Sequence, residues 1–119
     1  MTRATVLLAH GSRDPAWRRP IEAVAARMQE LAPQAQVCCA YLELTAPDLE
    51  SVVDALADAG TTAISIVPLL LGVGRHARQD MPRRVRQLAL RHPALAIDLR
   101  PAVGQEGDLI DLLARIALR

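Results

Sequence analysis

Two histidines stand at positions where the chain could bring them to one site. His10 ends the apolar run VLLA and is followed at once by Gly-Ser, and His76 follows the glycine-rich stretch GVGR. A carboxylate, Glu43, closes a further apolar run. Two neutral imidazoles and a carboxylate suit a borderline divalent ion such as Co²⁺, Fe²⁺, Ni²⁺ or Zn²⁺. Because two or three protein ligands leave coordination positions open, this set fits transfer or catalysis rather than a closed structural site.

Glycines and arginines surround these histidines. Gly72 and Gly74 would let the chain before His76 pass close to a large, flat ligand, since a glycine carries no side chain. Three arginines flank the histidines: Arg13, Arg75 and Arg78. The guanidinium group presents a planar fork of donors that matches a carboxylate or a phosphate. These arginines are either anchors for an acidic ligand or ordinary solvated charges.

Four short apolar runs and four longer amphipathic patterns alternate along the chain and must position these groups. The runs, expected to be strands, cover residues 5–9, 36–42, 63–70 and 94–99. The first and third are apolar at consecutive residues, which is typical of strands buried on both faces. The helical patterns begin near Pro20, Thr45, Asp80 and Gln105. This alternation predicts an α/β fold with a parallel sheet, helices on both faces and right-handed crossovers.

Each helical pattern carries an apolar stripe that we expect to face the core. The stripes are Ile21, Val24, Ala25, Met28 and Leu31; Leu49, Val52, Val53 and Leu56; Val85, Leu88 and Ala89; and Leu109, Ile110, Leu112, Leu113 and Ile116. His92 comes at the end of the third pattern, just before Pro93. We interpret His92 as structural, because a cation at the end of a helix interacts favourably with the helix dipole.

A flavodoxin-like strand order of 2-1-3-4 would place the first strand between the second and the third. Open parallel sheets bind ligands outside the carboxyl ends of their strands, where the strand order reverses. Neighbouring strands are about 4.8 Å apart, so His10, Glu43 and His76 could converge on one ion. Taken alone, either histidine could be a cap or a packed polar residue, and Glu43 could be a solvated residue before a helix. The occurrence of two histidines at adjacent tips favours a site.

The composition excludes several classes of partner. A chain of 119 residues fits one domain, and a hydrophobic fraction of 51% supports a globular core. Aromatic residues make up only 2%, so platforms for stacking bases are missing, and a net charge of +1 gives no footprint for nucleic acid or a membrane surface. No apolar stretch reaches the roughly 18 residues of a membrane span. We expect a cytoplasmic protein with Cys38 and Cys39 reduced, because neighbours on a strand point to opposite faces.

Three motifs follow one another over roughly residues 4–102: LLAHGSRD, AYLEL followed by APDLE, and VPLLLGVGRHARQDMP. Together they resemble the short CbiX-type sirohydrochlorin chelatases of the class II chelatase superfamily. The resemblance implies one flavodoxin-like chelatase domain over residues 1–119. It implies a metal-free, carboxylate-rich tetrapyrrole as substrate, Co²⁺ or Fe²⁺ as the inserted ion, with Co²⁺ favoured, and no organic cofactor. The longer members of this family contain two such halves and the short ones form homodimers, so a homodimer is expected.

The resemblance also implies roles for individual residues. The family's metal-binding histidines fall on His10 and His76, and its carboxylate falls on Glu43. The histidines would present the ion and accept or relay the two pyrrole protons, while Glu43 would orient an imidazole or take a proton. The residues expected to bind the tetrapyrrole are Arg13, Gly74, Arg75 and Arg78.

Three alternatives use the same residues differently. The triplet AHG resembles the R-H-G of histidine phosphatases, but Ala9 stands where an arginine would hold the phosphate. A non-catalytic metal or tetrapyrrole binding or delivery protein would bind at the same tips without turnover. A flavodoxin-like domain with no ligand would use neither histidine. Turnover of a phosphomonoester that is lost on mutation of His10 would indicate the first alternative. Optical spectra separate the second from a chelatase, since metal insertion changes the visible bands of the tetrapyrrole.

Overall fold

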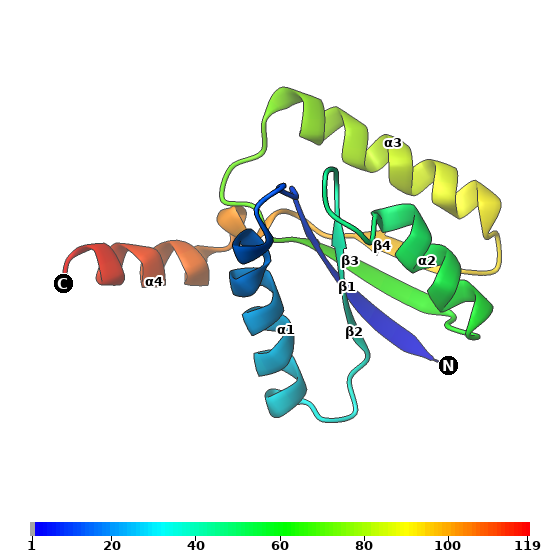
Figure 1. The fold of residues 1–119 in the computed structure, drawn as a ribbon, viewed down its shortest axis with the longest axis horizontal. Helices are drawn as coiled ribbons and strands as arrows, with labels where there is room; N and C mark the ends of the chain where they lie inside the picture. The colour runs from blue at the N-terminus through cyan, green and yellow to red at the C-terminus, as the bar shows by residue number, and fades with distance from the viewer. Residues whose placement is uncertain (1) are drawn as a thin grey trace.

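The computed structural model describes residues 2–119 and has a four-stranded, all-parallel sheet at its centre (Figure 1). The strand order is β2-β1-β3-β4, which confirms the predicted order. The strands are β1 (Arg3–Ala9), β2 (Val37–Tyr41), β3 (Ala63–Pro68) and β4 (Ala96–Leu99). All four strands lie where the apolar runs predicted them, with ends that differ by two residues at most.

Helices cover both faces of the sheet (Figure 1). They are the 3₁₀ turn η1 (Pro15–Arg18), α1 (Arg19–Leu31), α2 (Leu49–Asp58), α3 (Arg75–Arg91), the 3₁₀ turn η2 (Val103–Gln105) and α4 (Gly107–Ala117). α1 packs on one face, and α2 and α3 pack on the other. Among residues 2–119, no helix is both long and apolar enough to cross a membrane.

The main core lies between the sheet and the layer formed by α2 and α3. Its strand residues alternate along the central strands, as side chains of one sheet face must. The largest members that are fully buried are Val6, Leu8, Leu49, Val53, Ile64, Ile66, Pro68 and Leu88. Leu7 is buried on the opposite face, so β1 is covered on both sides as its sequence predicted. The predicted stripe of α2 is buried in full.

The prediction that the third helix begins near Asp80 is wrong. α3 begins at Arg75, and Pro82 lies inside the helix. A proline there removes one hydrogen bond and costs about 3 kcal/mol. The packing of the buried Met81 and the ion pairs of this helix outweigh that cost. His76 is therefore the second residue of a helix rather than part of a loop.

The remaining stripes are covered less completely than predicted. In α3, Ala89 is exposed while Leu88 is buried. α1 has no fully buried residue, and its Val24 and Leu31 are exposed. The stripe of α4, predicted to be buried, is largely exposed: Ile110 is 54% exposed, Leu112 50%, Leu113 38% and Ile116 45%. The reason is position, because α4 extends away from the sheet beyond η2 (Figure 1).

Candidate functional site

A pocket of about 380 Å³ opens at the carboxyl ends of β1 and β2, facing the first turns of α3. Its chemically active lining residues are His10, Glu43, Arg75, His76, Asp80 and Arg84. His10 directly follows β1, and Glu43 follows β2 by two residues, whereas the other four belong to α3. The pocket thus joins three segments that are far apart in the sequence.

One wall of the pocket is fixed by backbone hydrogen bonds between the two strand tips. The Leu42 N–H donates to the Ala9 carbonyl at 2.8 Å, and the Glu43 N–H donates to the His10 carbonyl at 3.0 Å. These bonds continue the β1–β2 ladder beyond the last paired residues of both strands. His10 and Glu43 are therefore held side by side by the sheet itself.

Gly11 makes this close approach possible. Its φ of +105° lies in a region that residues with a side chain rarely adopt. A Cβ at this position would sit 1.7 Å from the carbonyl oxygen of Glu43. The turn is closed further by Thr45, whose hydroxyl accepts from the Ser12 N–H and donates to the Ser12 carbonyl, both at 2.8 Å. The glycine after His10 is thus required by the backbone geometry.

The opposite wall is the amino-terminal end of α3. Gly74 precedes the helix in an extended conformation and provides no side-chain cap. The free N–H groups of a first helical turn and the positive end of the helix dipole attract anions. Arg75 and His76 occupy this turn and line the pocket. The wall is therefore cationic.

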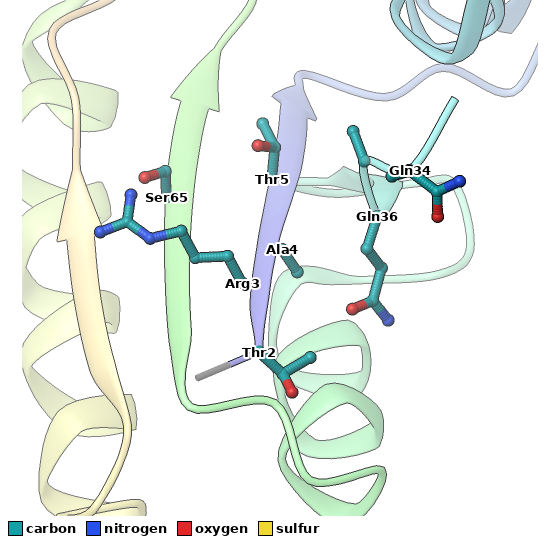
Figure 2. A pocket seen from close by; sticks show the side chains of 8 residues that line it. Thr2, Arg3, Ala4, Thr5, Gln34, Gln36 and Ser65 are labelled. Carbon is teal, nitrogen blue, oxygen red and sulfur yellow. The ribbon is translucent and has the colours of Figure 1, made fainter. Parts of the chain in front are cut away.

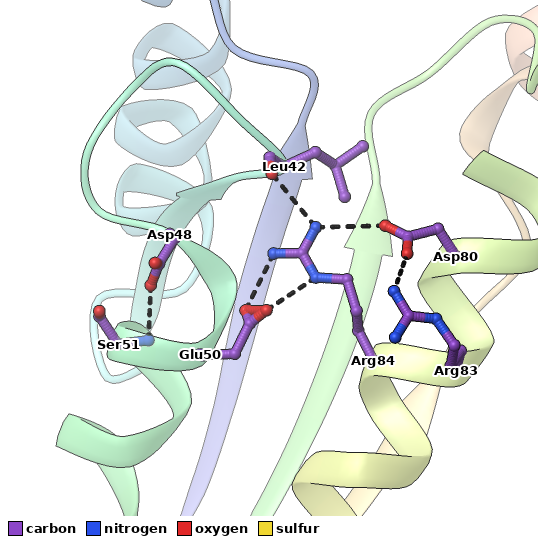
Figure 3. Close-up of polar contacts among 7 residues, drawn as sticks. All are labelled: Leu42, Asp48, Glu50, Ser51, Asp80, Arg83 and Arg84. Atoms are coloured by element: carbon purple, nitrogen blue, oxygen red, sulfur yellow. Dashed lines mark hydrogen bonds and ion pairs between the residues drawn. The ribbon is translucent and has the colours of Figure 1, made fainter. Parts of the chain in front are cut away.

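The same wall contains a network of charged groups around Arg84 (Figure 3). His76, Asp80 and Arg84 follow one another at intervals of four residues, so they form one row along the helix. The guanidinium of Arg84 binds both carboxylate oxygens of Glu50, at 2.7 and 2.9 Å, and donates to the Leu42 carbonyl at 3.2 Å. The hydrogen bond with Glu50 raises the pKa of Arg84.

Asp80 is held as a carboxylate within the same network. Arg83 donates a hydrogen bond to it, and an Arg84 nitrogen lies 3.6 Å from its second oxygen. The hydrogen bond from Arg83, followed by the charges of Arg83 and Arg84, lowers the pKa of Asp80. The sequence analysis missed Asp80 and Arg84 as pocket residues. Their spacing from His76 was the available signal, but it is visible only once the helix is known to begin at Arg75.

The structure brings some of the predicted site residues together and leaves others apart. His10, Glu43, His76, Gly74 and Arg75 all line the pocket. Arg13 and Arg78 are exposed and lie outside its lining. Within residues 2–119, no three side chains of His, Cys, Asp or Glu form a cluster that could hold a metal ion. His10, Glu43 and His76 line one pocket but, in this part of the chain, do not converge as a three-ligand metal site as expected.

The third histidine and the two cysteines belong to other parts of the structure. His92 ends α3, with its Nε2 atom 2.6 Å from a carboxylate oxygen of Asp54. Cys38 and Cys39 are free and half-buried in β2, and burial is the largest cause that raises the pKa of each thiol. Both thiols are therefore protonated at neutral pH, whereas a metal binds the thiolate.

A second cavity, of about 500 Å³, lies at the opposite end of the strands (Figure 2). Its lining includes Thr2, Arg3, Thr5, Gln34, Gln36 and Ser65. Arg3 is the one charged residue in this lining, which contains neither imidazole nor carboxylate. Although it is larger, this cavity has no imidazole, thiolate or carboxylate to ligate a transition-metal ion, so the pocket at the strand tips is the better candidate site.

The fold and the pocket define a class of protein: a parallel α/β domain with a histidine and a carboxylate just after two strand ends and a second histidine in the first turn of the facing helix. The chain belongs to the CbiX family, whose model matches residues 4–118. The sirohydrochlorin cobaltochelatase of Methanopyrus kandleri is 34% identical over 80 residues, which cover 67% of this chain and 56% of that protein.

Two solved structures share the fold over 97% of the chain. The CbiX protein from Marinobacter aquaeolei VT8 has a TM-score of 0.85 and 30% identity, with 93% of that chain covered. The sirohydrochlorin chelatase SirB from Bacillus subtilis subspecies spizizenii, solved in complex with cobalt, has a TM-score of 0.81 and 26% identity, with 49% covered. The chain thus spans about half the length of the Methanopyrus protein and of SirB.

Replacing Gly11 tests whether the turn after β1 sets this wall of the pocket. Gly60→Ala is the matched control, because Gly60 also has a positive φ, of +91°, but has open space around its Cβ position. We expect Gly60→Ala to lower the free energy of unfolding by about 1–2 kcal/mol from backbone strain. Gly11→Ala should cost at least about 1 kcal/mol more, because the Glu43 carbonyl must move. Urea denaturation measures both, and equal losses would contradict the close approach.

Proposed function

We propose that this chain is a sirohydrochlorin chelatase. It inserts a divalent metal, with Co²⁺ favoured and Fe²⁺ also accepted, into a metal-free, carboxylate-rich tetrapyrrole for cobalamin or siroheme biosynthesis. The observation that carries the proposal is that His10, Glu43 and His76, from three distant segments, line one pocket. The relatives named above support the reaction class. We propose that residues 1–119 act as one chelatase domain in the cytoplasm, without an organic cofactor and without a nucleic-acid or membrane partner.

The two imidazoles hold the incoming ion. A neutral imidazole is a good ligand for Co²⁺ and Fe²⁺, and histidine loses its proton near neutral pH. Two protein ligands leave the other coordination positions to water and, in turn, to the pyrrole nitrogens. His10 and His76 are exposed in the pocket, so neither ring has to be desolvated before the metal arrives.

Two pyrrole N–H protons must leave before the macrocycle can bind the metal. Glu43 is exposed at the pocket edge, and its backbone is tied to that of His10. A carboxylate at this place accepts a proton from the ring or orients the neighbouring imidazole. An imidazole that has released the ion accepts the second proton, so both protons leave the ring before its nitrogens close around the metal.

The carboxylates on the periphery of the tetrapyrrole meet the cationic wall. Arg75 lines the pocket and supplies one guanidinium for these carboxylates. Arg13 and Arg78 lie outside the lining but are exposed and near His10 and His76 in sequence, so they are assigned to the outer carboxylates of the ring. Gly74 has no side chain, so the backbone beside Arg75 leaves space for the large, flat ligand. Binding energy gained at the periphery helps to bend the ring and expose its nitrogen lone pairs.

Anaerobic incubation with sirohydrochlorin and either Co²⁺ or Fe²⁺, followed optically, tests this function. At limiting metal, His10→Ala and His76→Ala should each insert the ion at least about tenfold more slowly, since a catalytic residue of this kind contributes at least that factor. His92→Asn is the control and should stay within about twofold of the wild type. Wild-type rates for His76→Ala would contradict the proposal. A free-base spectrum that persists with both ligands bound would indicate a delivery protein instead.

We also infer that two copies of the chain associate through α4. Leu109, Leu112, Leu113 and Ile116 fall on one face of the helix, and the last three are exposed. A helix of 11 residues is only marginally stable in water on its own. The α1 side of the sheet is also incompletely covered, with Ser65, Val67 and Asp98 partly or fully exposed. A second copy offers the same two surfaces reciprocally, as a two-fold interface requires.

Sedimentation velocity tests the dimer. The wild type should sediment as a dimer at micromolar concentration, and Ile116→Glu should shift it towards the monomer, because a charge would be buried in the interface. Leu90→Glu is the control, since Leu90 is 82% exposed on α3, away from α4. A monomeric wild type, or equal shifts for both variants, would contradict the interface.

A further inference from the structure

The two walls of the pocket belong to different layers of the fold, and they are joined in different ways. His10 and Glu43 are tied to each other by the backbone of the sheet. His76 stands on α3, which packs over the sheet through side chains such as Met81 and Leu88. Apolar contacts are not directional, so they place the helix over the sheet without fixing its position along the strands. The separation between His76 and the strand tips therefore depends on something more specific.

Arg84 supplies a specific link between these walls (Figure 3). Its guanidinium donates to the carbonyl of Leu42, the residue directly before Glu43, at 3.2 Å. It also makes a two-point ion pair with Glu50, in the first turn of α2. One side chain on α3 thus bonds both to the residue directly after β2 and to the first turn of α2.

The surroundings of Arg84 favour a fixed geometry. Its side chain is only 13% exposed, so the ion pair with Glu50 is screened less by water than a surface pair. The planar guanidinium is matched to a carboxylate through two parallel bonds, which a lysine cannot reproduce. Asp80 contacts the remaining side of the group. Arg84 lies in the same row as His76, at a spacing of twice four residues, so a shift of the helix at Arg84 moves His76 with it.

We propose that Arg84 is a positioning residue that holds His76 at ligand distance from the ion bound by His10, although it touches neither the ion nor the substrate's reacting atoms. This inference rests on the proposed function, because it assigns a role within the metal pocket. A displacement of about 1 Å at a reacting group can cost about a hundredfold in rate. Loss of the grip on Leu42 and Glu50 should therefore appear first in metal binding.

The test is Co²⁺ affinity, measured by titration, with Arg84→Gln in two backgrounds. In the wild-type chain, Arg84→Gln should weaken Co²⁺ binding at least tenfold and tetrapyrrole binding by a smaller factor, because Arg84 also lines the pocket. In a His76→Ala background, the same substitution should change Co²⁺ affinity less than twofold, because His76 no longer contributes. Arg86→Gln, at an exposed arginine of the same helix, is the matched control and should leave both affinities within twofold of the wild type.

The design separates the possible failures. If Arg84→Gln binds Co²⁺ like the wild type, or weakens it equally with and without His76, the positioning role is wrong while the chelatase proposal stands. If the wild type and the double variant His10→Ala/His76→Ala bind Co²⁺ equally well, the proposed function fails. Should Arg84→Gln not fold, Glu50→Gln/Arg84→Gln replaces it, since removal of both charges leaves no unpaired buried ion. The loss of Co²⁺ affinity with and without His76 then tests the positioning role in the same way.

Discussion

The parallel pairing of β1 with β2 and β3 is the constraint on which the rest of this domain depends. The register pairs Ala9 with Tyr41 and Leu8 with Pro68, so all three strands end within one residue of a common line. The residues that follow these three strands must therefore emerge at the same edge of the sheet. Backbone hydrogen bonds, which any residue except proline can donate, thus determine where His10 and Glu43 lie, without a contribution from their side chains.

The structure separates stability from chemistry along the strands. Below the tips, aliphatic side chains fill the space between the sheet and the layer of α2 and α3, and their burial supplies the main driving force of folding. Above the tips, the imidazoles and the carboxylate are exposed to solvent. The buried lower part positions the groups, and the open upper part leaves them accessible to solvent. The Arg84 network lies at the boundary between the two parts.

Elements whose signals are local could be predicted from the sequence. The strands were found from their apolar runs, and α2 was found from its apolar stripe and the Gly60 that follows it. Its start was expected near Thr45, but Asp48 caps the helix, which begins at Leu49. His10 was recognisable because it directly follows a buried strand. These features need only the residue and its neighbours in the chain.

Features that depend on tertiary packing could not be predicted. Pro82 is a local signal for the start of a helix, yet packing and ion pairs extend α3 back to Arg75. That error also hid Asp80 and Arg84 from the predicted site. The apolar stripe of α4 has the pattern of a buried helix, but periodicity alone does not identify the surface that covers it. Within residues 2–119 much of this stripe is left exposed, and the proposed dimer would cover it with a second copy.

The central claim is that His10 and His76 bind one and the same metal ion. The chain has only three histidines, so ¹⁵N-histidine labelling gives a spectrum in which each ring can be followed during titration with paramagnetic Co²⁺. The account predicts that the rings of His10 and His76 undergo large hyperfine shifts together at a single equivalent, while His92 stays near its starting position. Separate titration of the two rings, or large shifts of only one of them, would contradict it.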